Sequence, residues 1–148
     1  MRSIAGSTLA VVLAATACTT TVTQVPVIEP TTPSSVEEPV TAVIAAALDA
    51  DRRLEPADSL WDPEATVVAG GVERYAPPRF AGVEPGGEVA VTSSRLDVRS
   101  GLAWVYVEYR WISLNEAVAR EGRATVLLIP KQDGKGWRIT HVHSSVAP

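Results

Sequence analysis

Cysteine is almost absent from this 148-residue chain, since Cys18 is the only one. A lone cysteine cannot form an internal disulfide, so the fold must be held together without one. Basic residues are not concentrated anywhere, and the 13 Lys and Arg are outnumbered by 17 Asp and Glu, for a formal net charge of -4. Such a balance offers no surface for a phosphate backbone, and it excludes nucleic acid as a partner.

Metal-ligating residues are equally sparse. The two histidines, His141 and His143, stand two positions apart near the C-terminus, and no cysteine follows Cys18. A zinc site takes about three or four ligands, and no Asp or Glu stands at a spacing that would complete one. We therefore expect no metal and no cofactor. The histidines are expected to form hydrogen bonds within a sheet or at a subunit interface.

No hydrophobic run near the N-terminus is long enough to span a membrane as a helix. Residues 1–17 combine Arg2, a short apolar stretch and the small-residue sequence Ala15-Thr16-Ala17, which is the pattern of a signal peptide. Cys18 follows directly, where a bacterial lipoprotein is lipidated, although Ala15 stands where leucine is usual. We predict a lipid anchor on Cys18 in the cell envelope, on the periplasmic face in a Gram-negative cell. Ordinary cleavage, with an idle thiol and a soluble secreted product, is the alternative.

Residues 18–35 are rich in proline and threonine and show no helical or strand periodicity. Prolines at this density favour an extended chain, so we predict a tether between the lipidated Cys18 and a domain formed by residues 36–148.

The pattern within residues 36–148 predicts helices first and antiparallel strands afterwards, an α+β arrangement. A proline- and glycine-rich stretch, Val72–Gly87, interrupts it and is typical of a lid or rim. The predicted helices are Val36–Leu54 and Pro56–Trp61, and the predicted strands are Ala65–Ala69, Glu88–Val98, Leu102–Ile112, Arg123–Ile129 and Trp137–Ser145.

Four segments resemble the SnoaL-like domain of the nuclear transport factor 2-like superfamily. They are Trp61-Asp62-Pro63-Glu64-Ala65-Thr66, Ala103-Trp104-Val105-Tyr106, Gly122-Arg123-Ala124-Thr125-Val126 and Trp137-Arg138-Ile139-Thr140-His141-Val142-His143-Ser144-Ser145. The last is most similar to the end of the association (hub) domain of calcium/calmodulin-dependent protein kinase II. The resemblance implies a cone-shaped, cystatin-like fold, in which N-terminal helices pack in the concave face of a strongly curved, mostly antiparallel sheet, with a pocket at the open end.

The same resemblance implies a ligand site on the strand Leu102–Ile112. An arginine of the hub family points into the pocket, and Arg110 matches it; a second family arginine falls on Leu127 here, and Arg123 could compensate. Strand alternation then predicts that Trp104, Tyr106 and Glu108 share the pocket face. On the closing strand Arg138, Thr140 and Ser144 are expected to point inward, and His141 and His143 outward. The opposite face of Leu102–Ile112, with Val105, Val107, Tyr109 and Trp111, would form an apolar outer surface that pairs with a second subunit.

Three functions remain open at this point, and a signalling or immunity partner is the third after the two described next. The first is an exported lipoprotein whose domain binds a small apolar or carboxylate ligand or serves as an assembly module, as a homodimer or higher homo-oligomer without catalysis. The second is an isomerase or dehydratase with Glu108 as general base, beside Arg110, Tyr106 or Arg123. A structural ion pair between Glu108 and Arg110 is the simpler alternative for these two charges. This fold hosts both classes of protein, so the resemblance does not decide between them.

Overall fold

A helix and a curled sheet make up the part of the chain that the computed structural model describes, residues 36–148. The signal peptide, Cys18 and the tether predicted for residues 1–35 lie outside the described residues. The elements follow the predicted order, and most bounds agree within a few residues. They are α1 Glu37–Arg52, a 3-10 turn η1 Asp58–Leu60, β1 Trp61–Ala69, β2 Val72–Glu73, β3 Gly87–Arg99, β4 Leu102–Ser113, β5 Ala119–Pro130 and β6 Trp137–Val146.

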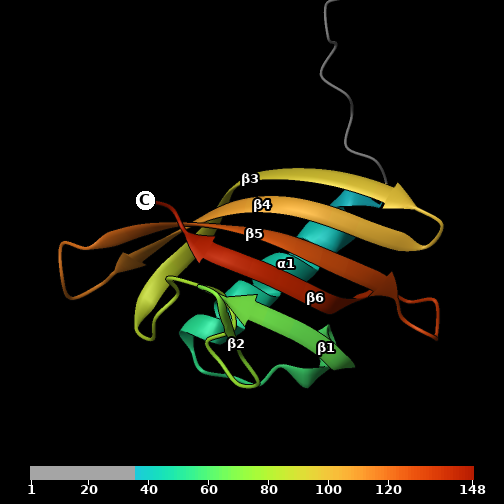
Figure 1. Ribbon diagram of the computed structural model, residues 1–148, viewed down its shortest axis with the longest axis horizontal. Helices are drawn as coiled ribbons and strands as arrows, with labels where there is room; N and C mark the ends of the chain where they lie inside the picture. The colour runs from blue at the N-terminus through green and yellow to red at the C-terminus, as the bar shows by residue number, and fades with distance from the viewer. Residues whose placement is uncertain (1–35) are drawn as a thin grey trace, which may run out of the picture. The chain divides into compact units, whose positions relative to one another are not determined.

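The helix α1 crosses one face of the sheet, as Figure 1 shows. Its apolar positions recur at helical spacing, so they form one stripe. Val40, Ile44 and Leu48 on this stripe are fully buried, and Asp51 continues it at the end of the helix. The predicted packing of an amphipathic helix against the curved sheet is therefore confirmed.

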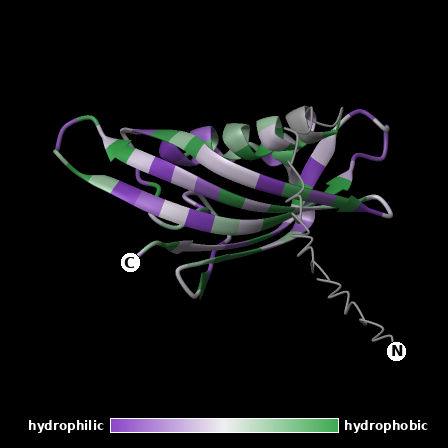
Figure 2. Cartoon of the chain, turned by 90° about the horizontal axis from the view of Figure 1, so that it is seen from above, coloured by the Kyte–Doolittle hydropathy of each residue, from purple (hydrophilic) through white to green (hydrophobic). Residues whose placement is uncertain are grey.

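The six strands follow the order β2-β1-β6-β5-β4-β3. β1 runs parallel to β6, and the other neighbours are antiparallel. From the edge strand β3 the chain therefore returns through three antiparallel hairpins to β6, which lies beside β1. Figure 2 shows the alternation of apolar and polar bands along these strands that assigns one face to the core.

The start of β1 differs from the prediction. A second helix was expected over Pro56–Trp61, but only the 3-10 turn η1 forms, and β1 already begins at Trp61. Pro63 lies inside this strand. It is tolerated because pairing with β6 is interrupted between Trp61 and Thr66, so no ladder hydrogen bond needs its missing N–H.

The predicted faces of β4 are wrong: they are reversed. Trp104, Glu108 and Arg110 are exposed and Tyr106 is half-buried, all on the side of the sheet away from α1. The side chains that were expected to form an outer dimer surface instead pack in the core; they are Val105, Val107, Tyr109 and Trp111. Because side chains alternate along a strand, assigning Arg110 to the inner face placed every side chain of β4 on the opposite face from the one it occupies.

The closing strand β6 contains a bulge. Leu127 of β5 pairs with His141 and Leu128 pairs with Ile139, so Thr140 is the extra residue. Strict alternation would have put Ile139 and His141 on one face, but the bulge buries Ile139 and leaves His141 on the outer face. Ser144 is buried and His143 is exposed, as predicted.

Candidate functional site

The residues predicted to bind a ligand lie together on the outer face of the sheet, not in a cavity under the helix. Trp104 is 41% exposed. The Tyr106 hydroxyl donates to a Glu108 carboxylate oxygen at 3.1 Å, and this hydrogen bond raises the pKa of the Tyr106 phenol. Arg123 stands opposite Glu108 in the register of β4 and β5. These residues share one face of the sheet, as strand alternation predicts, but it is the outer face and not the inner one. Their role in binding stays a prediction.

Arg110 does not pair with Glu108. Its Nε lies 3.2 Å from Glu121 on β5, and both side chains are half exposed to water. A pair in this position contributes little to stability because water screens it and both side chains lose rotamer freedom. The structural ion pair predicted for Arg110 therefore forms with a neighbouring strand instead.

A polar cluster that the sequence analysis did not identify lies inside the fold. Three side chains from three elements hold residues 79–81: Asp51 from α1, Tyr109 from β4 and Ser144 from β6. One carboxylate oxygen of Asp51 accepts from the backbone N–H of Arg79 at 2.5 Å and of Phe80 at 2.7 Å. The Tyr109 hydroxyl donates to the Ala81 carbonyl at 2.7 Å, and the Ser144 hydroxyl accepts from the Ala81 N–H at 3.0 Å.

Burial changes the protonation of this cluster. Asp51 is only 1% exposed, and burial raises its pKa from 3.8 to about 6, although the N–H donors of Phe80 and Arg79 oppose the shift. Burial also raises the pKa of the Tyr109 phenol. The cluster thus joins an acid that titrates near neutrality to a phenol that stays protonated.

Phe80 is anchored by this cluster and fills part of the interior between α1 and the sheet. Its ring meets Tyr109 edge to face, with centroids 5.8 Å apart, and lies 6.3 Å from the Trp61 ring. The segment Val72–Gly87, expected to be a lid or rim, therefore inserts its only phenylalanine into the core. Interior volume that the hub resemblance assigned to a pocket is occupied by protein.

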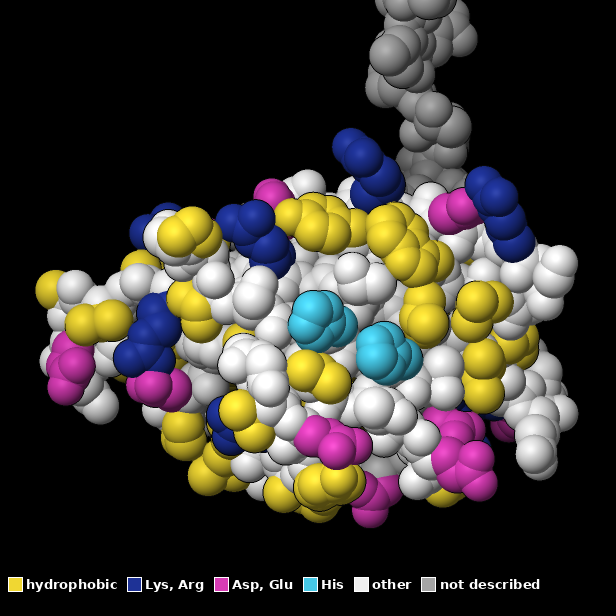
Figure 3. All heavy atoms as spheres, viewed as in Figure 1, with side chains coloured by type: hydrophobic (Ala, Val, Ile, Leu, Met, Phe, Trp, Pro, Cys, Tyr) yellow, Lys and Arg dark blue, Asp and Glu magenta, His cyan; other side chains and the backbone are white. Residues whose placement is uncertain are grey.

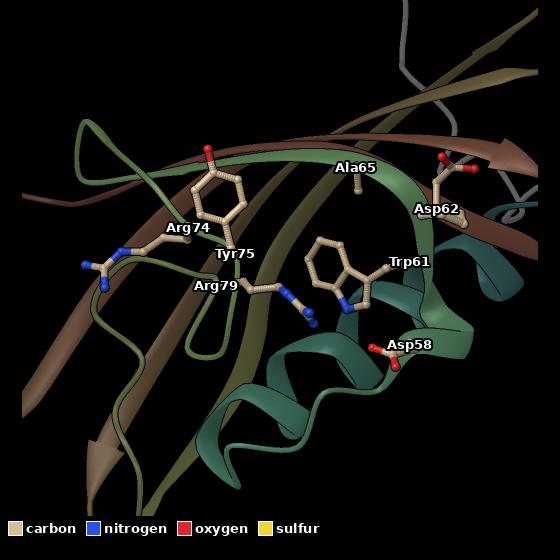
Figure 4. Close-up of a pocket in the computed structure, with 8 residues that line it drawn as sticks. Asp58, Trp61, Asp62, Ala65, Arg74, Tyr75 and Arg79 are labelled. Carbon is tan, nitrogen blue, oxygen red and sulfur yellow. The ribbon is translucent and has the colours of Figure 1, made fainter.

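A cavity of about 380 Å³ remains beside this insertion, between the start of β1 and residues 74–79. Figure 4 shows Arg79 and Asp58 directed towards Trp61, whereas Arg74 and Asp62 point away from it. The Arg79 guanidinium lies 4.6 Å from the Trp61 ring centroid and donates to the Pro56 carbonyl at 2.6 Å. The remaining lining residues are Pro63, Ala65 and Tyr75.

Some of these residues carried a signal in the sequence. Asp51 continues the apolar series Ile44 and Leu48 at helical spacing, and an acid on a buried stripe is a candidate for an unusual environment. Arg79 and Phe80 carried no such signal, because both lie in an irregular segment whose course no periodicity predicts.

No group of three His, Cys, Asp or Glu side chains that could hold a metal occurs within residues 36–148. Within the same range, no helix has the length and apolar character needed to cross a membrane.

Solved structures with the same arrangement of helix and sheet identify the fold. A nuclear transport factor 2-like superfamily protein from Salmonella enterica serovar Typhimurium superposes with a TM-score of 0.58 at 16% identity, over 76% of this chain and 92% of that one. The calcium/calmodulin-dependent protein kinase II hub of S. rosetta gives 0.56 at 15% identity, over 78% of this chain and 100% of that one. The chain has the nuclear transport factor 2-like fold.

Similarity to this fold extends to proteins with different names. A proposed ketosteroid isomerase from Parabacteroides distasonis gives a TM-score of 0.56 at 13% identity, over 78% of this chain and 93% of that one. No protein-family model matches the chain, and no curated protein is significantly similar to it in sequence. At such identities the comparisons establish the nuclear transport factor 2-like fold and leave the activity to be argued from residues.

Proposed function

We propose that residues 36–148 form an assembly domain that pairs with a second copy through the outer face of the sheet. One observation carries this proposal: a row of apolar and aromatic side chains crosses that face at the centre of the sheet. Trp104 of β4 pairs with Leu127 of β5, which pairs with His141 of β6. The next row contains Tyr106, Thr125 and His143.

This outer row has the composition of an interface. Figure 3 shows the two histidines side by side in the middle of the face, with hydrophobic side chains around them and charged groups mainly towards the edges. Aromatic residues are enriched where two proteins pair, whereas an exposed apolar patch on a monomer favours aggregation. A two-fold contact would bring each row against its symmetry mate. The similarity in fold to a protein named as a hub is consistent with assembly.

Sedimentation velocity of the purified chain tests the proposal. We expect a dimer or larger homo-oligomer for the wild type, and dissociation for Trp104→Asp, because a carboxylate in this row cannot be buried at an interface without a partner. Leu114→Asp is the matched control, since Leu114 is an exposed leucine in the turn between β4 and β5. A monomeric wild type, or equal dissociation by both variants, would refute assembly through this face.

The second candidate function is the binding of a small molecule, and the cavity beside Trp61 favours it. Its volume of about 380 Å³ falls within the range of small-molecule sites. Native mass spectrometry of protein purified from its source tests this candidate and assembly together, because it reports the subunit number and any retained ligand. Spectra of the folded protein that carry no small molecule under any gentle condition would argue against it.

Catalysis by Glu108 receives no support from the geometry. A general base of this kind has to face a cavity that excludes water, and Glu108 is exposed on the outer face and accepts a hydrogen bond from Tyr106. Asp51 is buried, but its carboxylate already accepts two backbone N–H groups. A domain without catalysis is therefore the better proposal.

Export and lipidation complete the proposal, and they rest on residues 1–18 of the sequence. In this proposal Cys18 carries the lipid and the tether holds the domain away from the membrane surface. Fractionation and intact mass of the wild type and Cys18→Ser in the source cell test it. We expect the wild type in the membrane fraction with added lipid mass and the variant in the soluble fraction; a soluble wild type with an unmodified Cys18 would contradict the anchor.

A further inference from the structure

The cavity beside Trp61 contains an acid and a base that the fold itself does not pair. Within residues 36–148, the Asp58 carboxylate forms no hydrogen bond or ion pair. Arg79 uses one nitrogen to donate to the Pro56 carbonyl and stacks on Trp61, and no carboxylate of the described residues lies within ion-pair distance of it. Both groups therefore keep bonding capacity for a bound molecule.

A third polar group lies with them. The indole N–H of Trp61 has no hydrogen-bond partner among the described residues. Among the described residues, Nε of Arg138 is the only buried side-chain nitrogen or oxygen that has no hydrogen-bond partner. The unpaired indole nitrogen of Trp61 is therefore not buried, and a ligand can reach it. Trp61 itself is only 6% exposed, so the free edge that carries this donor is what reaches the cavity. Figure 4 shows the indole nitrogen on the side of Arg79 and Asp58.

The signs of the charges restrict the ligand. Besides Arg79 and Asp58, which are directed towards Trp61, the lining includes Arg74 and Asp62 at its ends, so the cavity carries charges of both signs. A simple anion would be repelled by the acids, and a simple cation by the arginines. A small molecule that carries a positive and a negative group close together can pair with the acids and the arginines at the same time.

We infer that this cavity binds the head group of a free α-amino acid with an apolar side chain. The ligand carboxylate accepts from the Arg79 guanidinium and the Trp61 indole N–H, while its ammonium group donates to Asp58. Charge-assisted hydrogen bonds of this kind are stronger than neutral ones, and a guanidinium fork matches a carboxylate. The inference rests on the second candidate function, small-molecule binding.

The remaining lining suits the ligand side chain. Pro63 and Ala65 provide an apolar wall on β1. Tyr75 is 82% exposed, and its hydroxyl is hydrogen-bonded to Glu73, which raises the pKa of the phenol. Its ring is therefore what remains for a ligand to pack against.

Calorimetric titration of the purified chain with three probes tests the inference. L-phenylalanine carries both charges, 3-phenylpropionate lacks the ammonium group, and phenethylamine lacks the carboxylate. For the wild type we expect L-phenylalanine to bind at least about tenfold more tightly than either analogue, since each analogue leaves one charge of the site unpaired.

Substitutions of Asp58 and Arg79 test which of the two residues binds the ammonium group of the ligand and which binds its carboxylate. Asp58→Asn should weaken the binding of L-phenylalanine and of phenethylamine about tenfold and leave the binding of 3-phenylpropionate unchanged. Arg79→Gln should weaken the binding of L-phenylalanine and of 3-phenylpropionate and leave the binding of phenethylamine unchanged. Arg79→Lys keeps the charge and should recover part of the loss. Asp97→Asn and Arg95→Gln on β3 are the matched controls, and neither should affect any probe.

These opposite effects on the two analogues distinguish ligand recognition from damage to the fold, because a substitution that only disturbs the fold would weaken the binding of all three probes equally. Equal losses for the three probes would overturn the inference, as would equal binding of the analogues and L-phenylalanine by the wild type. Absence of L-phenylalanine binding would overturn the amino-acid assignment. Native mass spectrometry would still report any other retained molecule, so the proposed binding function fails or survives separately.

Discussion

Replacing Asp51 by asparagine tests the electrostatics of the interior directly. Burial raises the pKa of Asp51 from 3.8 to about 6 in the folded chain, whereas in the unfolded chain it should stay near 3.8. Between these two values the folded state holds a proton that the unfolded state has released. Stability from this group is therefore greatest below about pH 4, falls as the pH rises towards about 6, and is constant above that.

The size of the effect follows from the shift. A difference of about two pKa units at 1.36 kcal/mol per unit corresponds to about 3 kcal/mol of unfolding free energy. This is a large fraction of the 5–15 kcal/mol, roughly, that stabilises an ordinary domain. Because asparagine does not titrate, the difference in unfolding free energy between wild type and Asp51→Asn should fall by about 2 to 3 kcal/mol from about pH 4 to about pH 7.

Urea denaturation of both proteins at a series of pH values measures this difference. Taking the difference cancels the titration of every other carboxylate, as long as those sites are independent of Asp51. Asp97→Asn is the control, since the exposed pair of Asp97 with Arg99 should be worth no more than about 1 kcal/mol. A difference that rises with pH would mean that the hydrogen bonds from Arg79 and Phe80 outweigh burial, and a constant difference would mean that Asp51 titrates alike in both states.

Three further substitutions test the packing around the inserted segment. Phe80→Ala should lower the unfolding free energy by about 3 to 5 kcal/mol, because it leaves a cavity in the core; urea denaturation measures it, and a loss below about 1 kcal/mol would contradict the insertion. Tyr109→Phe should cost about 1 to 3 kcal/mol in the same assay, because the buried Ala81 carbonyl loses its donor, whereas the exposed Tyr75→Phe should be nearly neutral. Gly122→Ala should lower the thermal unfolding midpoint by several degrees, since a Cβ there would overlap the Tyr109 ring; an unchanged midpoint would show that the ring can move aside.

Much of the fold could be predicted from the sequence because local patterns carry it. The helix follows from its apolar stripe and the strands from alternation between glycine-rich turns, so their order agrees with the structure. The face of β4 was harder, because aromatic residues occur on both sides of it: Trp104 and Tyr106 on one, Tyr109 and Trp111 on the other. Glu108 and Arg110 carried the deciding information, since charged side chains belong on the side that reaches water.

The inserted segment could not be predicted, because its position depends on partners far away in the chain. The bonds that hold residues 79–81 come from Asp51, 28 and 29 positions away, from Tyr109, 28 positions away, and from Ser144, 63 positions away. None of these pairs has a local signature. The bulge at Thr140 is a similar case, since it appears only when β5 and β6 are aligned.

The anchoring of residues 79–81 also links the cavity to the stability of the domain. Arg79 lines the cavity and stacks on Trp61, and its neighbour Phe80 is buried in the core, so the inserted ring holds the backbone that carries the guanidinium. A ligand that binds Arg79 and Asp58 therefore binds the folded state and not the unfolded one. Such a ligand raises the unfolding free energy by about 1.4 kcal/mol for each tenfold increase in its concentration above the dissociation constant. Removing the Phe80 ring should weaken binding even though this residue touches no ligand, because it sets the position of the arginine that does.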